Sequence, residues 1–148
     1  MRKLMFGLLL GLIVGTGVAA YAQHKPVTTP DAPEAIGPYS QAIQAGNMLF
    51  LSGQLPIDPK TKQLKADASI EDQTRQVLDN LKAVLAANSM TMANVVWASV
   101  FMKDLNDFPK MNAVYGTYFK EAPPARATVE VARLPRDAKI QIAAIAVR

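Results

Sequence analysis

The stretch "PPARATVEV" (residues 123–131) places two prolines directly before an alternating run of side chains. Small and apolar side chains fall on one face and polar ones on the other: Ala125, Ala127, Val129 and Val131 against Arg126, Thr128 and Glu130. A period of two predicts a β-strand with two unlike faces. The prolines fix the direction of the chain where this strand begins. We therefore expect Arg126 to lie at the start of the strand with its backbone orientation fixed. Taken alone, the polar face is typical of the solvated side of an edge strand.

Four more strands and two helices are expected around this strand. A β-hairpin is predicted from residues 39–44 and 48–53, which flank the turn "AGN" (45–47). Residues 69–90 form the clearest helix, because Ser69 and Asp72 make a capping-box-like start and an apolar stripe follows at helical spacing. The stripe consists of Ile70, Val77, Leu78, Leu81, Val84 and Leu85. Residues 106–120 are predicted as the second helix, and 94–105, 125–134 and 139–147 as the remaining strands.

The resulting order is β-β-α-β-α-β-β, an α+β fold with two helices on one face of a mixed or mostly antiparallel sheet. The other face of the sheet should be open. Several of its candidate side chains are apolar or aromatic, including the only tryptophan, Trp97. An exposed apolar surface of this size favours self-association, so we expect an oligomer.

The N-terminus has the pattern of a cleavable signal peptide in residues 1–22. Arg2 and Lys3 precede the apolar segment 4–14, and Ala20-Tyr21-Ala22 is a small-residue cleavage pattern. Cleavage after Ala22 would export the protein to the periplasm or the medium, with no stable membrane insertion afterwards. Residues 23–35 contain three prolines and no apolar periodicity, which predicts a flexible arm before a single domain over 36–148.

Composition excludes several kinds of chemistry. The chain has no cysteine and one histidine, His24, so neither a Ser-His or Cys-His nucleophile pair nor a zinc site of the usual type can be assembled. Phosphate-binding glycine loops are also missing from the sequence. Removal of Arg2 and Lys3 leaves 14 basic and 12 acidic residues, a balance that gives little attraction to nucleic acid. A ribonuclease activity is therefore disfavoured.

Several segments together resemble the Rid family (RidA, YjgF), which also carries the older label endoribonuclease L-PSP. The segments are "AIGPYSQAI" (35–43), "LSGQLPIDPKT" (51–61), "FMKDLNDFPKMNAVYGTYF" (101–119) and "PPARATVEVARLPRDAKIQIAAIAV" (123–147). The resemblance implies a chorismate-mutase-like α+β fold, assembled as a homotrimer with three ligand clefts between subunits. It also implies a deaminase of the 2-iminobutanoate/2-iminopropanoate type. Such an enzyme hydrolyses reactive enamines and imines to 2-keto acids and ammonia without a cofactor.

The resemblance also assigns site residues. Arg126 would grip the substrate carboxylate, and a guanidinium suits this role because its planar fork offers two parallel donors. Four further residues match positions that line the family's cleft: Tyr39, Ser52, Gly53 and Asn112. Thr128 stands where the archetype has a cysteine whose backbone matters, so threonine should be tolerated.

Gln141 departs from the family pattern, which has a glutamate thought to orient the attacking water. A glutamine amide can hold a water by hydrogen bonding but cannot take its proton. An imine is already electrophilic, so orientation and carboxylate binding predict a weakened or altered deaminase. The alternative is a non-catalytic module of the same fold that binds small carboxylates in the cleft between subunits.

Overall fold

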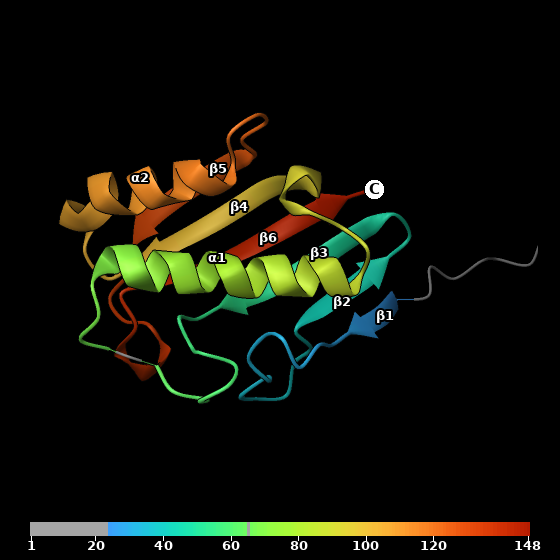
Figure 1. Cartoon of the computed structure of the whole chain (residues 1–148), viewed down its shortest axis with the longest axis horizontal. Coiled ribbons are helices and arrows are strands. Elements are labelled where there is room, and N and C mark those ends of the chain that lie inside the picture. The colour runs from blue at the N-terminus through green and yellow to red at the C-terminus, as the bar shows by residue number, and fades with distance from the viewer. Residues whose placement is uncertain (1–23, 65) are drawn as a thin grey trace, which may run out of the picture.

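Six strands form one mixed sheet in the computed structural model, which describes residues 24–64 and 66–148 (Figure 1). The strands are β1 (His24–Val27), β2 (Ala42–Ala45), β3 (Met48–Gln54), β4 (Val95–Met102), β5 (Ala125–Glu130) and β6 (Ile140–Val147). Their order across the sheet is β1-β2-β3-β6-β4-β5. All neighbours pair antiparallel except β4 and β5, which are parallel. The predicted signal peptide, residues 1–22, lies outside the described residues.

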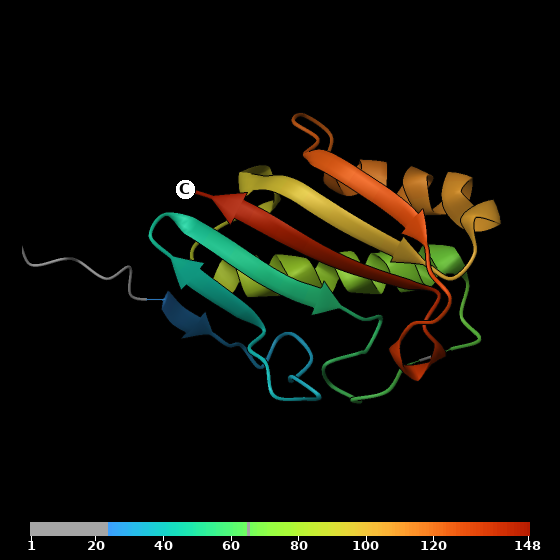
Figure 2. The same ribbon diagram turned by 180° about the vertical axis from the view of Figure 1, so that it is seen from behind.

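Two helices, α1 (Ile70–Ala87) and α2 (Phe108–Tyr118), cover the same face of the sheet (Figure 1). Seen from behind, no helix of the described residues covers the opposite face (Figure 2). α1 begins as the sequence predicted, since the Ser69 side chain accepts a hydrogen bond from the backbone N–H of Asp72. α2 connects β4 to β5, because two parallel neighbours need a crossover. Three one-turn 3₁₀ helices complete the connections: Met92–Asn94, Leu105–Asp107 and Pro135–Asp137.

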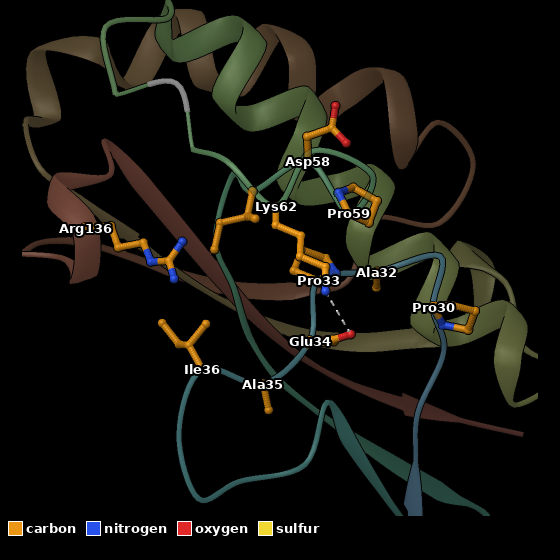
Figure 3. A pocket seen from close by; sticks show the side chains of 11 residues that line it. Pro30, Ala32, Pro33, Glu34, Ala35, Ile36, Asp58, Pro59, Lys62 and Arg136 are labelled. Carbon is orange, nitrogen blue, oxygen red and sulfur yellow. Dashed lines mark hydrogen bonds and ion pairs between the residues drawn. The ribbon is translucent and has the colours of Figure 1, made fainter.

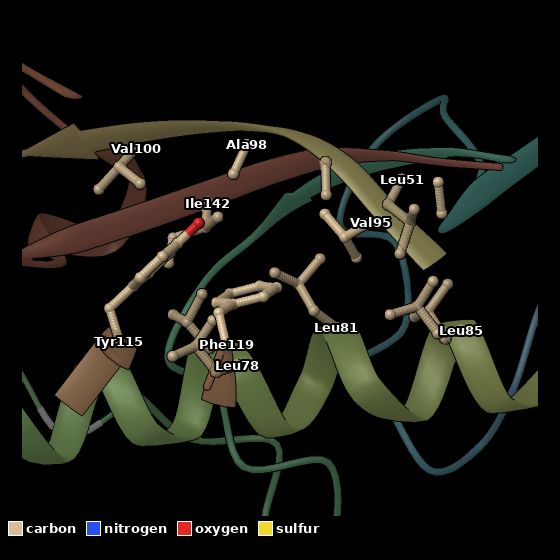
Figure 4. Close-up of a cluster of buried hydrophobic side chains, with 14 of the residues drawn as sticks. Leu51, Leu78, Leu81, Leu85, Val95, Ala98, Val100, Tyr115, Phe119 and Ile142 are labelled. Carbon is tan, nitrogen blue, oxygen red and sulfur yellow. The ribbon is translucent and has the colours of Figure 1, made fainter. Parts of the chain in front are cut away.

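The core lies between the helices and the sheet (Figure 4). The apolar stripe predicted for the first helix is fully buried there, and it packs on the alternate residues of β6 and β4 that face the helices. Burying each large aliphatic side chain contributes about 1.5–3 kcal/mol, so this two-layer arrangement is where most of the folding energy arises. Within the part of the chain that the structure describes, no helix is long and apolar enough to cross a bilayer.

The structure places residues 24–35, which belong to the predicted flexible arm, against the sheet. Residues His24–Val27 pair with β2 as an edge strand, and Val27 and Ala32 are buried. The buried side chain of Gln41 secures the rest of the segment. Its Nε2 donates to the carbonyls of Thr29 (3.1 Å), Ala32 (3.1 Å) and Pro33 (2.7 Å), and its Oε1 accepts from Thr29 N–H (2.7 Å). Hydrogen bonds to one distant side chain supply the order that local periodicity did not indicate.

Some predicted element ends also differ. β2 begins at Ala42, so Tyr39 lies in the preceding loop and not in a strand. β4 ends at Met102 and β5 at Glu130, several residues before the predicted ends. The expectation of an apolar open face is confirmed. Phe50, Trp97 and Val129 project there and stay 42%, 39% and 45% exposed, respectively.

Candidate functional site

Arg126 lies near the start of β5, and its guanidinium contacts two aromatic rings. It is paired in register with Ala98 of β4 and therefore faces the helix side of the sheet. Its guanidinium carbon stands 4.4 Å from the ring centroid of Tyr115 and 5.6 Å from that of Phe108. Nη2 donates a 2.8 Å hydrogen bond to Oδ1 of Asn112. Phe108, Asn112 and Tyr115 come from one face of α2, because their spacing of four and three residues matches the helical repeat.

This arrangement restrains the guanidinium without neutralising it. Among the described residues no carboxylate pairs with Arg126, and only its bond to Asn112 uses a donor. Glu130, on the same face of β5, instead accepts the backbone N–H of Leu105 at 2.8 Å. The other N–H donors of Arg126 remain available for an external anion. Since both aromatic contacts are cation–π contacts, they also limit the rotation of the side chain.

Two buried hydroxyls accompany Arg126. Neither Tyr115 Oη nor Thr128 Oγ1 has a hydrogen-bond partner among the described residues. The Tyr115 ring points from α2 toward Val100 and Ile142 in the core (Figure 4). Burial raises the pKa of Tyr115, and the positive charge of Arg126 offsets part of that rise. The phenol therefore stays neutral at physiological pH.

Gln141 and Gly53 form a second group, where β6 meets an irregular part of β3. The pairing register shifts between Leu51 and Gln54. There Nε2 of Gln141 donates a hydrogen bond to the Gly53 carbonyl at 3.3 Å. A Cβ on Gly53 would stand only 2.6 Å from Nε2 and 2.8 Å from Cδ of Gln141. The φ of Gly53 is not in the left-handed region, so the backbone conformation does not require a glycine. The reason for glycine here is the close approach of the Gln141 side chain, which leaves no room for a Cβ.

Ser52 and Tyr39 extend this second group. The Ser52 hydroxyl donates to the carbonyl of Ser40 at 2.6 Å, which ties β3 to the loop before β2. Tyr39 is 48% exposed, and its hydroxyl accepts a hydrogen bond from the backbone N–H of Ile36 at 3.2 Å. Tyr39 and Gly53 both line a small pocket of about 20 Å³. A cavity of that size holds about one water molecule, so this group alone does not enclose a ligand.

The predicted site residues thus fall into two groups on opposite faces of the sheet. Arg126 is in register with Ala98, whereas Gln141 is in register with Phe101, three positions along β4. An odd separation along a strand places the two side chains on opposite faces. Arg126, Asn112 and Thr128 therefore form one group and Tyr39, Ser52, Gly53 and Gln141 the other. A single chain does not bring the two groups together.

Two residues next to Arg126 were not predicted as part of the site. Phe108 and Tyr115 fall within the second helix predicted over residues 106–120, and the sequence assigned them no role in the site. The signal that could have identified them is their helical spacing from Asn112, which the resemblance placed in the cleft. No group of three or more His, Cys, Asp or Glu residues stands ready to hold a metal ion within residues 24–64 and 66–148.

The model of the family described as endoribonuclease L-PSP matches residues 29–148. The chain belongs to this family. The resemblance to the Rid family is thereby confirmed, and a RutC family protein of Pyrococcus horikoshii is 56% identical over 120 residues, covering 81% of this chain and 94% of the relative.

Two Escherichia coli proteins are also similar to this chain. The 2-iminobutanoate/2-iminopropanoate deaminase of strain K12 is 50% identical over 127 residues, covering 84% of this chain and 98% of the relative. The crystal structure of TdcF with bound serine superposes with a TM-score of 0.79 at 45% identity, covering 84% of this chain and 98% of that one. The Rid-type fold predicted from the sequence is confirmed by this similarity.

Proposed function

We propose that the protein hydrolyses small 2-imino acids and their enamine tautomers to 2-keto acids and ammonia. The observation that carries this proposal is the state of the Arg126 guanidinium. Asn112 and the Tyr115 ring hold it in place, and it keeps free N–H donors and no carboxylate partner among the described residues. A planar fork with free donors suits a carboxylate. The similar Escherichia coli protein named 2-iminobutanoate/2-iminopropanoate deaminase supports the reaction. TdcF with bound serine supports a ligand of amino-acid size.

The complete site is proposed to lie between subunits of a homotrimer. The Arg126 group and the Gln141 group occupy different surfaces of one chain, so a contact that joins them between copies is heterologous. Such a contact either closes into a ring or grows into a filament, and three copies related by rotation would give a closed ring with three equivalent sites. The exposed Phe50, Trp97 and Val129 supply apolar surface for this packing.

The chemistry needs few groups from the protein. Arg126 of one subunit would bind the α-carboxylate and place the protonated C=N over Gly53 and Gln141 of the next. Nε2 of Gln141 is bound to the Gly53 carbonyl, which leaves Oε1 as an acceptor for a water O–H. That water adds to the imine carbon and forms a carbinolamine. The C–N bond then breaks, ammonia leaves and the 2-keto acid remains.

Gln141 limits the rate in this scheme. An amide orients the water but does not accept its proton, which must pass to solvent or to the departing nitrogen. We therefore expect turnover below that of the Gln141→Glu variant. In that variant a carboxylate oxygen would face the Gly53 carbonyl, so the pKa of the new carboxyl should be raised. A raised pKa suits a group that must exchange a proton near neutral pH.

The test is decay of 2-iminobutanoate, generated in situ, with the chain from residue 23 onward. Arg126→Ala should lower kcat/KM by roughly 100-fold, because it removes charge-assisted hydrogen bonds worth about 1.5–3 kcal/mol. Arg126→Lys should recover part of the loss, since a point charge replaces the fork. If the wild-type rate equals the protein-free rate, the enzyme proposal fails. Binding of 2-ketobutanoate without turnover would then favour the carboxylate-binding module.

We also propose that the working protein is exported, with the leader removed after Ala22. The support is the basic start, the apolar segment and the small-residue cleavage pattern of residues 1–22. The imines that it meets would then form outside the cytoplasm. N-terminal sequencing of the protein from cell fractions tests this, with Gln23 expected as the first residue of the exported form.

A further inference from the structure

A larger pocket of about 330 Å³ lies beside the sheet, among the loops (Figure 3). Three segments line it: part of the loop 30–36, part of the loop 57–62, and Arg136 of the last 3₁₀ helix. Its walls are largely apolar, with Ile57 buried and Ile36 half exposed. This volume falls at the lower end of the range for small-molecule sites. Nothing in the proposed reaction at Gly53 and Gln141 uses it.

Arg136 is the one charged lining residue of this pocket without a partner among the described residues. Lys62 is paired with Glu34 at 3.4 Å. The Asp58 carboxylate accepts the backbone N–H groups of Lys60 (2.7 Å) and Thr61 (3.2 Å), and so closes its own turn. The Arg136 guanidinium makes no hydrogen bond or ion pair within the described part of the chain, and Figure 3 shows it directed into the pocket above Ile36.

The backbone places Arg136 there in a conformation that arginine rarely adopts. Its φ is 55° and its ψ is 24°, in the left-handed region. A non-glycine residue in this region is strained and is kept where the surrounding structure demands it. A glycine at this position would relieve the strain. The presence of an arginine instead indicates a functional role for its side chain, such as binding a ligand.

This pocket adjoins the second group of the proposed reaction site. It shares Pro33, Glu34, Ile36 and Ile57 with the small pocket that Tyr39 and Gly53 line. A substituent on a ligand held over Gly53 would therefore run past Ile36 and Ile57 toward Arg136. Aliphatic walls suit methylene groups, and the unpaired guanidinium suits a terminal anion.

We propose that Arg136 determines substrate specificity and that the preferred substrates are 2-imino acids whose side chain ends in a second carboxylate. This inference rests on the proposed function. Arg126 of a neighbouring subunit holds the α-carboxylate, and Arg136 holds the distal one. Methylene groups between them lie over Ile36 and Ile57. Short imines still react, because they reach Arg126 and Gln141 without Arg136.

The experiment compares kcat/KM for 2-iminoglutarate and 2-iminobutanoate, both generated in situ. Wild type should prefer 2-iminoglutarate by about 10-fold, the effect expected of one additional charge-assisted contact. Arg136→Gln should bring the ratio near one and leave 2-iminobutanoate hydrolysis unchanged. Arg136→Gly should do the same while keeping or raising Tm, a combination that a merely structural role would not produce. Arg133→Gln, at a nearby exposed arginine outside the pocket lining, is the matched control and should keep the preference.

The outcomes separate this inference from the proposed function. Hydrolysis of both imines with the same ratio in wild type and Arg136→Gln would overturn the role of Arg136 and leave the proposed function standing. If neither imine is hydrolysed, the proposed function fails. The pocket is then tested by thermal stabilisation with 2-ketoglutarate against 2-ketobutanoate. A preference for 2-ketoglutarate that Arg136→Gln removes would support the pocket as a binding site, and equal stabilisation by both acids would overturn it.

Discussion

Gly53→Ala is the substitution that most directly tests the geometry of the Gln141 group. The added Cβ would lie 2.6 Å from Nε2 and 2.8 Å from Cδ of Gln141. Ordinary contacts of a Cβ begin near 3.4 Å, so the amide must move by about 0.8 Å or more. This movement would break the 3.3 Å hydrogen bond to the Gly53 carbonyl and turn Oε1 away from its position.

The expected losses of stability and of activity differ strongly. Overpacking costs about 1–3 kcal/mol where the neighbour cannot move, but here the clash is with the end of a flexible side chain. We therefore expect a loss of less than about 1 kcal/mol in the free energy of unfolding. A displacement of about 1 Å at a reacting centre can cost roughly 100-fold. Accordingly, kcat/KM for 2-iminobutanoate should fall by about 10- to 100-fold.

Gly116→Ala is the matched control, because a Cβ at this position in α2 meets nothing within 4 Å. It should raise stability by about 0.5–1 kcal/mol, as alanine does in a helix, and leave kcat/KM unchanged. The double variant Gly53→Ala/Gln141→Ala should be no slower than Gln141→Ala alone, because the methyl group acts through Gln141. Full activity in Gly53→Ala, at wild-type stability, would refute the role assigned to the Gly53–Gln141 contact.

Three further predictions concern Tyr115 (beside Arg126), Gln41 and Tyr118. Tyr115→Leu removes the closer cation–π contact of Arg126, so calorimetry should show 2-ketobutanoate binding weakened about 3- to 30-fold. Tyr115→Phe keeps the ring and loses only the hydroxyl, so it should bind as wild type does. Equal losses of affinity in the two variants would contradict the role of the ring. Gln41→Leu leaves several backbone groups of residues 29–33 without hydrogen-bond partners. The free energy of unfolding measured in urea should therefore fall by roughly 2 kcal/mol, and amide hydrogen exchange in residues 29–33 should accelerate. Unchanged exchange would show that Gln41 does not hold this segment in place. Burial and a 2.8 Å hydrogen bond to Asp79 raise the pKa of Tyr118 to about 12, above its ordinary 10, so the stability from this proton-bearing hydroxyl is present below pH 10 and lost between pH 10 and 12. The stability difference between wild type and Tyr118→Phe should therefore shrink across that range in urea titrations, and a constant difference would contradict it.

The elements with strong periodicity were predictable and the irregular ones were not. The stripe from Ile70 to Leu85 specified α1, since helical spacing and a Ser69 cap are local properties. Alternation specified β5 and β6 for the same reason. β1 was missed because a four-residue edge strand containing a proline has almost no local pattern. Its order comes from pairing with β2, and Gln41 holds the residues 29–33 that follow it.

For the site, the chain itself specified which residue types were present and where they alternated. The alternating run with Arg126 after two prolines was visible as a local pattern, whereas Asn112 and Gln141 were assigned to the site only by the resemblance to the Rid family. Tertiary structure decided which of them meet. The register of β4 with β5 and β6 puts Arg126 and Gln141 on opposite faces of the sheet. The crossover through α2 brings the Tyr115 ring into contact with the Arg126 guanidinium. The contact of Gln141 with Gly53 spans 88 positions of the chain. Distances of that kind depend on how layers pack, and no local pattern encodes them.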